Sequence, residues 1–246
     1  MIRDLQAKYR GTTLGFLWAI ALPLIMLAVY AFVFGSIFKS RWGAQGGMAD
    51  FVPMLYCGLI VHGLFSETLT RAPGAIISNP GYVKKVVFPL ELLPVIYVAS
   101  ATFNAFIGLG LLALLTLVQK HTLAPTMFFA PFVIMPLLLL VIGFAWFFAA
   151  IGVFFRDIGQ IIGVAMTMFL FLSPVFYPVS SAPAIAQILI SFNPLTYPIE
   201  ELRNVFLSGG YPNFGYWLIY SMVSIAIAWL GLWSFQRTRP AFADVV

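Results

Sequence analysis

Six long apolar runs, separated by shorter polar stretches, dominate the sequence. A helix that crosses the hydrocarbon of a bilayer needs about 20 mostly apolar residues, and these runs approach or exceed that length. None of them alternates polar and apolar positions in a sustained way, so the pattern is typical of helices rather than membrane strands. The sequence therefore predicts an all-α integral membrane protein. Its six expected spans cover residues 14–38, 51–70, 90–118, 128–155, 161–177 and 217–235.

Lys and Arg residues near the ends of the runs predict the orientation. Six spans place both termini on one side of the membrane, together with the connections that follow the second and fourth spans. Nine of the 13 Lys and Arg residues lie on that side and four on the other. Because cytoplasmic loops carry the excess of Lys and Arg, both termini are expected in the cytoplasm.

The connection between the fifth and sixth spans, residues 178–214, is unusual. It contains an apolar run at 184–192 that is too short to span, followed by Asn193-Pro194 and the acidic pair Glu200-Glu201. A run of this length is typical of a re-entrant or interfacial segment. We therefore expect an outer loop that dips back into the membrane and gates a pathway. A surface loop lying among the headgroups is the alternative.

Composition agrees with a membrane protein and excludes several other classes. Hydrophobic residues make up 62% of the 246 residues and charged residues 9%, whereas soluble domains carry about 25% charged residues. So few charges cannot solvate a globule of this size, which excludes a soluble enzyme, a disordered chain and a nucleic-acid-binding module. The net charge of +5 then indicates charge asymmetry across a bilayer rather than nucleic-acid binding. The single cysteine, Cys57, excludes an intramolecular disulfide.

The predicted spans carry little ionisable chemistry. His62 and Asn104 are the main polar side chains at mid-depth, and His62 is expected to form a hydrogen bond between helices rather than to bind a metal. Glu67 and Arg71, four residues apart, favour an ion pair on one helix face. Glu91 begins the third span. The sequence contains no phosphate-binding loop, so ATP-driven work must come from another chain.

Four groups of residues, in a fixed order, carry a family resemblance. They are Lys8-Tyr9-Arg10-Gly11 with Leu14-Gly15 and Leu17-Trp18; Asn79-Pro80-Gly81 with Val83-Lys84-Lys85 and Phe88-Pro89-Leu90-Glu91; Phe155-Arg156-Asp157-Ile158 with Leu172-Ser173-Pro174-Val175-Phe176-Tyr177-Pro178; and Asn193-Pro194-Leu195-Thr196 with Arg203-Asn204. With these groups the chain resembles the permease subunits of polysaccharide-exporting ABC transporters of the type-2 fold, which export O-antigen, capsule and teichoic acid. The family pattern has a longer amphipathic helix before the first group, so the start is either truncated or short.

The resemblance implies a single permease domain over residues 1–246 in the bacterial cytoplasmic (inner) membrane. It implies a homodimer clasped from the cytoplasm by two copies of an ABC ATPase subunit, which bind the ATP and Mg, while this chain binds no cofactor or metal and is not itself an enzyme. The cytoplasmic connection 72–89 is the candidate coupling loop, and its candidate contacts with the ATPase are Asn79, Tyr82, Lys84 and Lys85. An interfacial loop whose lysines only enforce topology is the alternative.

Aromatic side chains at helical spacing in the first and fifth spans are candidates for lining a substrate channel, because sugars present C–H faces that stack on aromatic rings. The resemblance also implies that these two helices border the conduit. The candidates are Trp18, Tyr30, Phe34, Phe169, Ser173, Phe176 and Tyr177. Packing against other helices is the alternative. The interfacial segment 1–13 supplies cations for membrane lipids and for an anionic headgroup or diphosphate, namely Arg3, Lys8 and Arg10.

The leading hypothesis is therefore the membrane subunit of an ATP-driven exporter of a lipid-linked or long-chain polysaccharide. One alternative is an ABC exporter of a small amphipathic drug or lipid. The other is an intramembrane glycan or lipid transferase, which requires paired carboxylates or histidines at the interface. Beyond Glu200-Glu201 the sequence offers no such pair.

Overall fold

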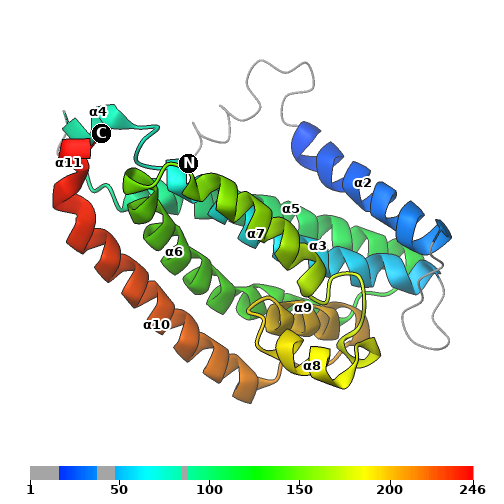
Figure 1. Ribbon diagram of the computed structural model, residues 1–246. Coiled ribbons are helices and arrows are strands. Elements are labelled where there is room, and N and C mark those ends of the chain that lie inside the picture. The colour runs from blue at the N-terminus through cyan, green and yellow to red at the C-terminus, as the bar shows by residue number, and fades with distance from the viewer. Residues whose placement is uncertain (1–16, 38–47, 85–87, 246) are drawn as a thin grey trace.

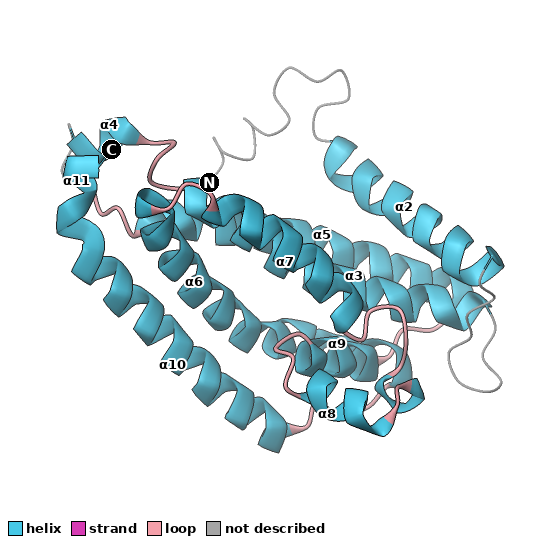
Figure 2. Cartoon of the chain, viewed as in Figure 1, coloured by secondary structure: helices cyan, strands magenta, loops and turns pink. Residues whose placement is uncertain are grey.

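Helices form almost all of the protein (Figure 2). The computed structural model describes residues 17–37, 48–84 and 88–245. Within these ranges there is no strand. The prediction of an all-α protein is confirmed.

Among the described residues, five helical segments are long and apolar enough to cross a membrane, and they match five of the six predicted runs. Their bounds are Trp18–Ile37, Asp50–Gly74, Leu92–Lys120, Pro125–Phe154 and Phe214–Ala241. They contain α2 (Trp18–Tyr30) with its π-helical continuation (Ala31–Ile37), α3 (Met48–Arg71), α5 (Leu92–Lys120), α6 (Ala130–Phe154) and α10 (Phe214–Thr238). The shorter helices are α4 (Pro80–Lys84), α7 (Ile158–Leu172), α8 (Ala184–Ser191), α9 (Thr196–Arg203) and α11 (Phe242–Val245).

The fifth predicted run, 161–177, ends earlier than expected. Its helix, α7, has 15 residues and stops at Leu172, so the prediction of helix through residue 177 is wrong. Ser173 is already extended, with φ −88° and ψ 153°. The cause is Pro174, because proline disfavours the helical conformation of the residue before it. At 1.5 Å per residue, α7 rises about 22 Å, which is less than the roughly 30 Å hydrocarbon core.

The helices run roughly along one direction and form two closely packed pairs, α3 with α5 and α6 with α10 (Figure 1). α7 packs on α3, and α2 lies along the outer side of α3 and α5. One end of the molecule carries α4 and α11, and the opposite end carries α8 and α9 (Figure 1). Successive long helices thus point in opposite directions, as short connections between spans require.

The unusual connection at 178–214 folds into the two short helices α8 and α9. α8 keeps Ile185, Ile188 and Leu189 exposed, whereas α9 is buried against α3 and α6. The segment is therefore split between a piece inside the protein and an apolar piece at its surface. The sequence predicted that this connection contains an apolar segment too short to span the membrane. It did not predict that the connection forms two short helices.

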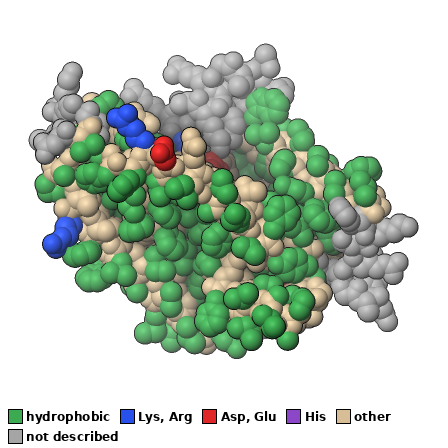
Figure 3. All heavy atoms as spheres, viewed as in Figure 1, with side chains coloured by type: hydrophobic (Ala, Val, Ile, Leu, Met, Phe, Trp, Pro, Cys, Tyr) green, Lys and Arg blue, Asp and Glu red, His purple; other side chains and the backbone are tan. Residues whose placement is uncertain are grey.

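The centre of the molecule is α3, and α2 is its least buried long helix. In the most apolar stretch of each segment, 61% of Asp50–Gly74 is buried but only 6% of Trp18–Ile37. The face shown in Figure 3 is mostly hydrophobic, and its visible Lys, Arg, Asp and Glu side chains lie toward the end that carries α4 and α11. A continuous apolar surface of this kind suits contact with lipid.

Two glycines allow α6 and α10 to approach closely. A Cβ atom on Gly143 of α6 would lie 2.6 Å from the Ile227 carbonyl oxygen and 2.7 Å from the Ala228 Cα atom, both in α10. A Cβ atom on Gly231 of α10 would in turn collide with the backbone of Gly143. Small residues of this kind are how membrane helices bring their backbones together.

Gly143→Ala is expected to destabilise the protein, because the added methyl group forces α6 and α10 apart. Overpacking of this kind costs about 1–3 kcal/mol, and each kcal/mol lowers the Tm by roughly 2–4 °C in a chain of this size. Thermal unfolding in detergent measures the effect. The matched control is Gly163→Ala in α7, where an added Cβ meets no atom within 4 Å. Equal Tm values for the two variants would contradict the close approach.

Candidate functional site

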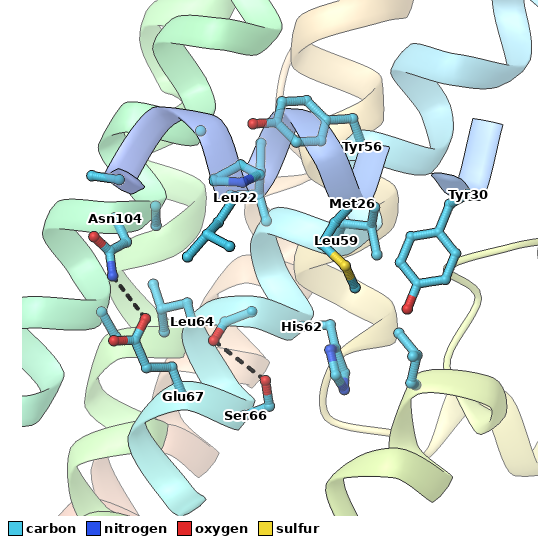
Figure 4. A pocket seen from close by; sticks show the side chains of 18 of the residues that line it. Leu22, Met26, Tyr30, Tyr56, Leu59, His62, Leu64, Ser66, Glu67 and Asn104 are labelled. Carbon is cyan, nitrogen blue, oxygen red and sulfur yellow. Dashed lines mark hydrogen bonds between the residues drawn. The ribbon is translucent and has the colours of Figure 1, made fainter. Parts of the chain in front are cut away.

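One face of α2 forms the wall of a cavity. Trp18, Leu22, Met26 and Tyr30 recur every fourth residue and therefore share one helix face. All four border a cavity of about 450 Å³ that lies between α2, α3 and α5 (Figure 4). Two of the predicted channel residues, Trp18 and Tyr30, thus line a space within the chain.

Polar side chains gather on the α3 and α5 walls of this cavity. The Asn104 Nδ2 atom donates a hydrogen bond of 2.8 Å to the Glu67 carboxylate, as Figure 4 shows. The other carboxylate oxygen of Glu67 lies 3.7 Å from the Arg71 guanidinium, whose carbon atom is 4.2 Å from the centre of the Tyr97 ring. The predicted ion pair between Glu67 and Arg71 is confirmed, and Asn104 joins it from the neighbouring helix.

His62 serves helix packing, as the sequence predicted. Its Nε2 atom lies 3.0 Å from the Met166 carbonyl oxygen of α7. A carbonyl only accepts, so this nitrogen carries the proton. Among the described residues, no group of three His, Cys, Asp or Glu side chains is placed to hold a metal ion.

The aromatic residues predicted from the first and fifth spans meet where α2 continues into its π-helical turn. The Phe34 and Phe176 rings stack with centroids 4.4 Å apart, and the Tyr30 ring lies 5.5 Å from that of Phe176. Phe169 packs further along, 5.7 Å from Phe65 of α3. We name Tyr30, Phe34 and Phe176 the aromatic seam.

Ser173 and Tyr177, the other two predicted channel residues, hold the chain that follows α7. Ser173 is fully buried, and its hydroxyl oxygen accepts a 3.0 Å hydrogen bond from the Asn193 side chain. The Tyr177 hydroxyl donates to the Phe171 carbonyl at 3.1 Å. Both side chains are therefore engaged within the protein.

Arg203 is the residue whose importance the sequence did not reveal. Its side chain is almost completely buried at the end of α9 and donates three hydrogen bonds to three different segments. The Nε atom donates to the Met54 carbonyl of α3 at 3.0 Å. Nη1 donates to the Glu200 carboxylate at 2.8 Å, and Nη2 donates to the Val175 carbonyl at 3.1 Å. The sequence placed Arg203 in a motif and counted it only as an outer cation; its spacing from Glu200 was the available signal.

Arg203 remains positively charged although its side chain is buried. Burial lowers the pKa of the guanidinium, and the neighbouring Glu200 carboxylate opposes that shift. Because arginine stays protonated in proteins, this is a buried cation held by one carboxylate and two backbone carbonyls. A planar group with donors on several sides suits such a position better than a lysine ammonium.

The predicted coupling loop contains α4, and its described residues have distinct roles. The Asn79 side chain donates to the Ala75 carbonyl at 2.9 Å, which fixes the turn before α4. Tyr82 is exposed and its ring lies 4.9 Å from that of Phe88. The side chains of Lys84 and Lys85 lie outside the described part of the chain, as do the predicted headgroup contacts Arg3, Lys8 and Arg10.

The start of α5 is tied to the C-terminal part of the chain. Glu91 precedes Leu92 at the helix start, as predicted. Its carboxylate lies 3.3 Å from the Arg239 guanidinium, and its backbone carbonyl accepts a 2.9 Å hydrogen bond from the Trp146 indole. The start of α5 is therefore anchored to both α6 and the end of α10.

A comparison with protein families decides what kind of protein carries this arrangement. A model of the ABC-2 type transporter family matches residues 1–207. The chain belongs to this family. Together with its apolar helices, this makes it a multi-pass protein of the cytoplasmic (inner) membrane.

Several curated proteins are similar to this ABC-2 chain over almost its whole length. The O-antigen export system permease protein RfbA of Myxococcus xanthus is 25% identical, over 99% of this chain and 92% of the relative. RfbA of Klebsiella pneumoniae is 23% identical, with the same coverage. The polysialic acid transport protein KpsM of Escherichia coli is 27% identical, over 97% of this chain and 91% of the relative.

In this ABC-2 chain, Arg203→Met is expected to lower stability substantially. The variant keeps the length of the side chain but leaves the Val175 carbonyl without its donor, and an unpaired buried group of this kind costs about 1–3 kcal/mol. Thermal unfolding and proteolysis of the segment after α7 measure the loss. Arg237→Met, at an exposed position in α10, is the matched control and should shift the Tm little. A control-like Tm for Arg203→Met would refute the structural role of Arg203.

Proposed function

We propose that this ABC-2 chain is the permease subunit of an ATP-driven exporter that moves a lipid-linked or long-chain polysaccharide across the cytoplasmic membrane. The observation that carries the proposal is the nearly full-length similarity to RfbA and KpsM, whose names describe O-antigen export and polysialic acid transport. The scarcity of paired ionisable groups in the described spans argues against an intramembrane transferase.

The proposal includes six spans with both termini in the cytoplasm. The five long helices and α7 alternate in direction (Figure 1), so α7 with the non-helical residues after it serves as the fifth span. The bias of Lys and Arg toward one side favours placing the end with α4 and α11 in the cytoplasm. The opposite end, with α8 and α9, then faces outward and gates the exit.

The ATP hydrolysis in this proposal belongs to a partner, two copies of an ABC ATPase that bind ATP and Mg. α4 is the proposed contact, because Tyr82 is exposed next to the basic pair Lys84-Lys85, and Asn79 holds the turn in place. An exposed aromatic ring with two lysines close to it in the sequence suits docking into a groove on another protein. Movement of α4 reaches α5 through the short connection that ends at Glu91.

The proposed substrate path runs along α2 and α7 in a homodimer. α2 is lightly packed, so its separation from α7 disrupts few contacts and presents the rings of the aromatic seam. These rings are suited to the C–H faces of a sugar chain as it passes, while Trp18, Phe169, Ser173 and Tyr177 flank them. Arg3, Lys8 and Arg10 supply cations for the diphosphate or headgroup of a lipid carrier.

Deletion of the gene tests this function directly. Loss of the surface glycan, with a lipid-linked glycan accumulating inside the cell, is the expected result, because synthesis continues while export stops. Surface-glycan analysis and extraction of lipid-linked intermediates measure both effects. Wild type and the structurally neutral Gly163→Ala variant should restore export. An unchanged glycan profile without an accumulating intermediate would reject polysaccharide export and favour a small amphipathic substrate.

A further inference from the structure

The cavity between α2, α3 and α5 has the size and lining of a small-molecule site. Its volume of about 450 Å³ falls within the roughly 300–1,000 Å³ of sites that bury drug-sized ligands. Most of the wall is apolar and includes Leu22 and Met26 of α2 and Leu59 and Ile60 of α3. Figure 4 shows Leu22, Met26 and Leu59 close together. Such a wall suits a hydrocarbon body.

Two buried polar atoms in the cavity wall lack a hydrogen-bond partner within the described part of the chain. They are the Tyr56 hydroxyl and the Asn104 Oδ1 atom, and both residues line the cavity. Tyr56 is only 3% exposed. Unpaired buried polar atoms are costly and uncommon in native proteins. Each of these two side chains can turn its oxygen toward a ligand that fills the cavity.

Tyr56 and Asn104, which carry the two unpaired atoms, occupy neighbouring parts of the cavity wall. A Cβ atom on Gly108, another cavity residue, would lie 3.7 Å from the Tyr56 hydroxyl oxygen. Asn104 precedes Gly108 by one helical turn on the same face of α5. A single small head group can therefore lie within reach of both side chains.

The polar atoms favour a neutral donor as the head group. Asn104 Oδ1 and the Glu67 carboxylate only accept hydrogen bonds, and a tyrosine hydroxyl either donates or accepts. Arg71, 3.7 Å from Glu67, already offsets the negative charge, which disfavours an ammonium group. A sugar chain requires hydrogen-bond partners along its whole length, and this wall does not supply them.

We propose that the cavity binds a neutral lipid alcohol, a compact hydrocarbon chain that ends in a hydroxyl group. The hydroxyl donates its single hydrogen to Asn104 Oδ1 and accepts from Tyr56, while the chain lies against Leu22 and Met26. Such a ligand bridges α2 to α3 and α5 and steadies the least buried long helix. The site adjoins the aromatic seam at Tyr30 and does not depend on what the transporter exports.

A photoreactive probe tests the site on the purified full-length chain in nanodiscs. The probe is a twelve-carbon alcohol with a diazirine in its chain, and the labelled peptides are identified by mass spectrometry. Labelling of α2, α3 and α5 is expected, with dodecanol competing better than dodecane or dodecylammonium. Tyr56→Phe should reduce labelling about threefold to tenfold, as the loss of one hydrogen bond implies, without lowering the Tm.

A cavity-filling pair of variants separates this site from general lipid contact. Gly63 lines the cavity and a Cβ added there meets no atom within 4 Å, so Gly63→Leu fills the space and should abolish labelling. Gly110→Leu makes the same change at an exposed position of α5 where a Cβ is also unobstructed, and it should label like wild type. Equal labelling of all variants, or equal competition by dodecane, overturns the proposal. Glycan export is not a readout, so this result stands apart from the proposed function.

Discussion

The fold depends on satisfying the backbone polar groups where α7 stops short of a full span. Between Ser173 and Tyr177 the chain is not helical, and the hydrocarbon of a membrane offers no water to its carbonyls. The protein supplies the missing partners from its own outer helices, above all through the Arg203 guanidinium on the Val175 carbonyl. The same side chain reaches α3, so the break in α7, the buried helix α9 and the central helix are held together by one cation.

Packing is distributed unevenly, and this asymmetry links the structure to transport. α6 and α10 touch backbone to backbone at Gly143 and Gly231, which leaves little freedom for relative motion. α2, in contrast, rests on the body through the aromatic seam and borders a cavity along the rest of its length. Because segments with few buried contacts open most readily, α2 is the helix best suited to move during a transport cycle.

Sequence patterns predicted the features that depend on residues close together along the chain. Apolar runs located the long helices, since span length is set by the bilayer. The four-residue spacing of Glu67 and Arg71 predicted their ion pair, and the row from Trp18 to Tyr30 does share one face. Proline disfavours a helical conformation of the residue before it, so Pro174 alone predicts that α7 ends at about residue 172. The apolar run that continues to residue 177 obscured this signal.

Other features depend on contacts between distant parts of the chain. The partners of Arg203 come from α3 and from the segment after α7, 149 and 28 residues away in sequence. Asn104 meets Glu67 across 37 residues, and the cavity exists only where three helices fail to close on one another. No periodicity in a single sequence carries this information. Such features follow from tertiary packing alone.

We propose that this chain, with an ATPase partner, carries a glycan across the membrane. ATP-dependent transport in inside-out membrane vesicles, with a radiolabelled lipid-linked glycan supplied on the outside, is the direct test. Protected label is expected to accumulate in the lumen only when the chain, its ATPase and ATP are all present. Accumulation of the same amount without ATP, or in vesicles that lack this chain, would contradict it.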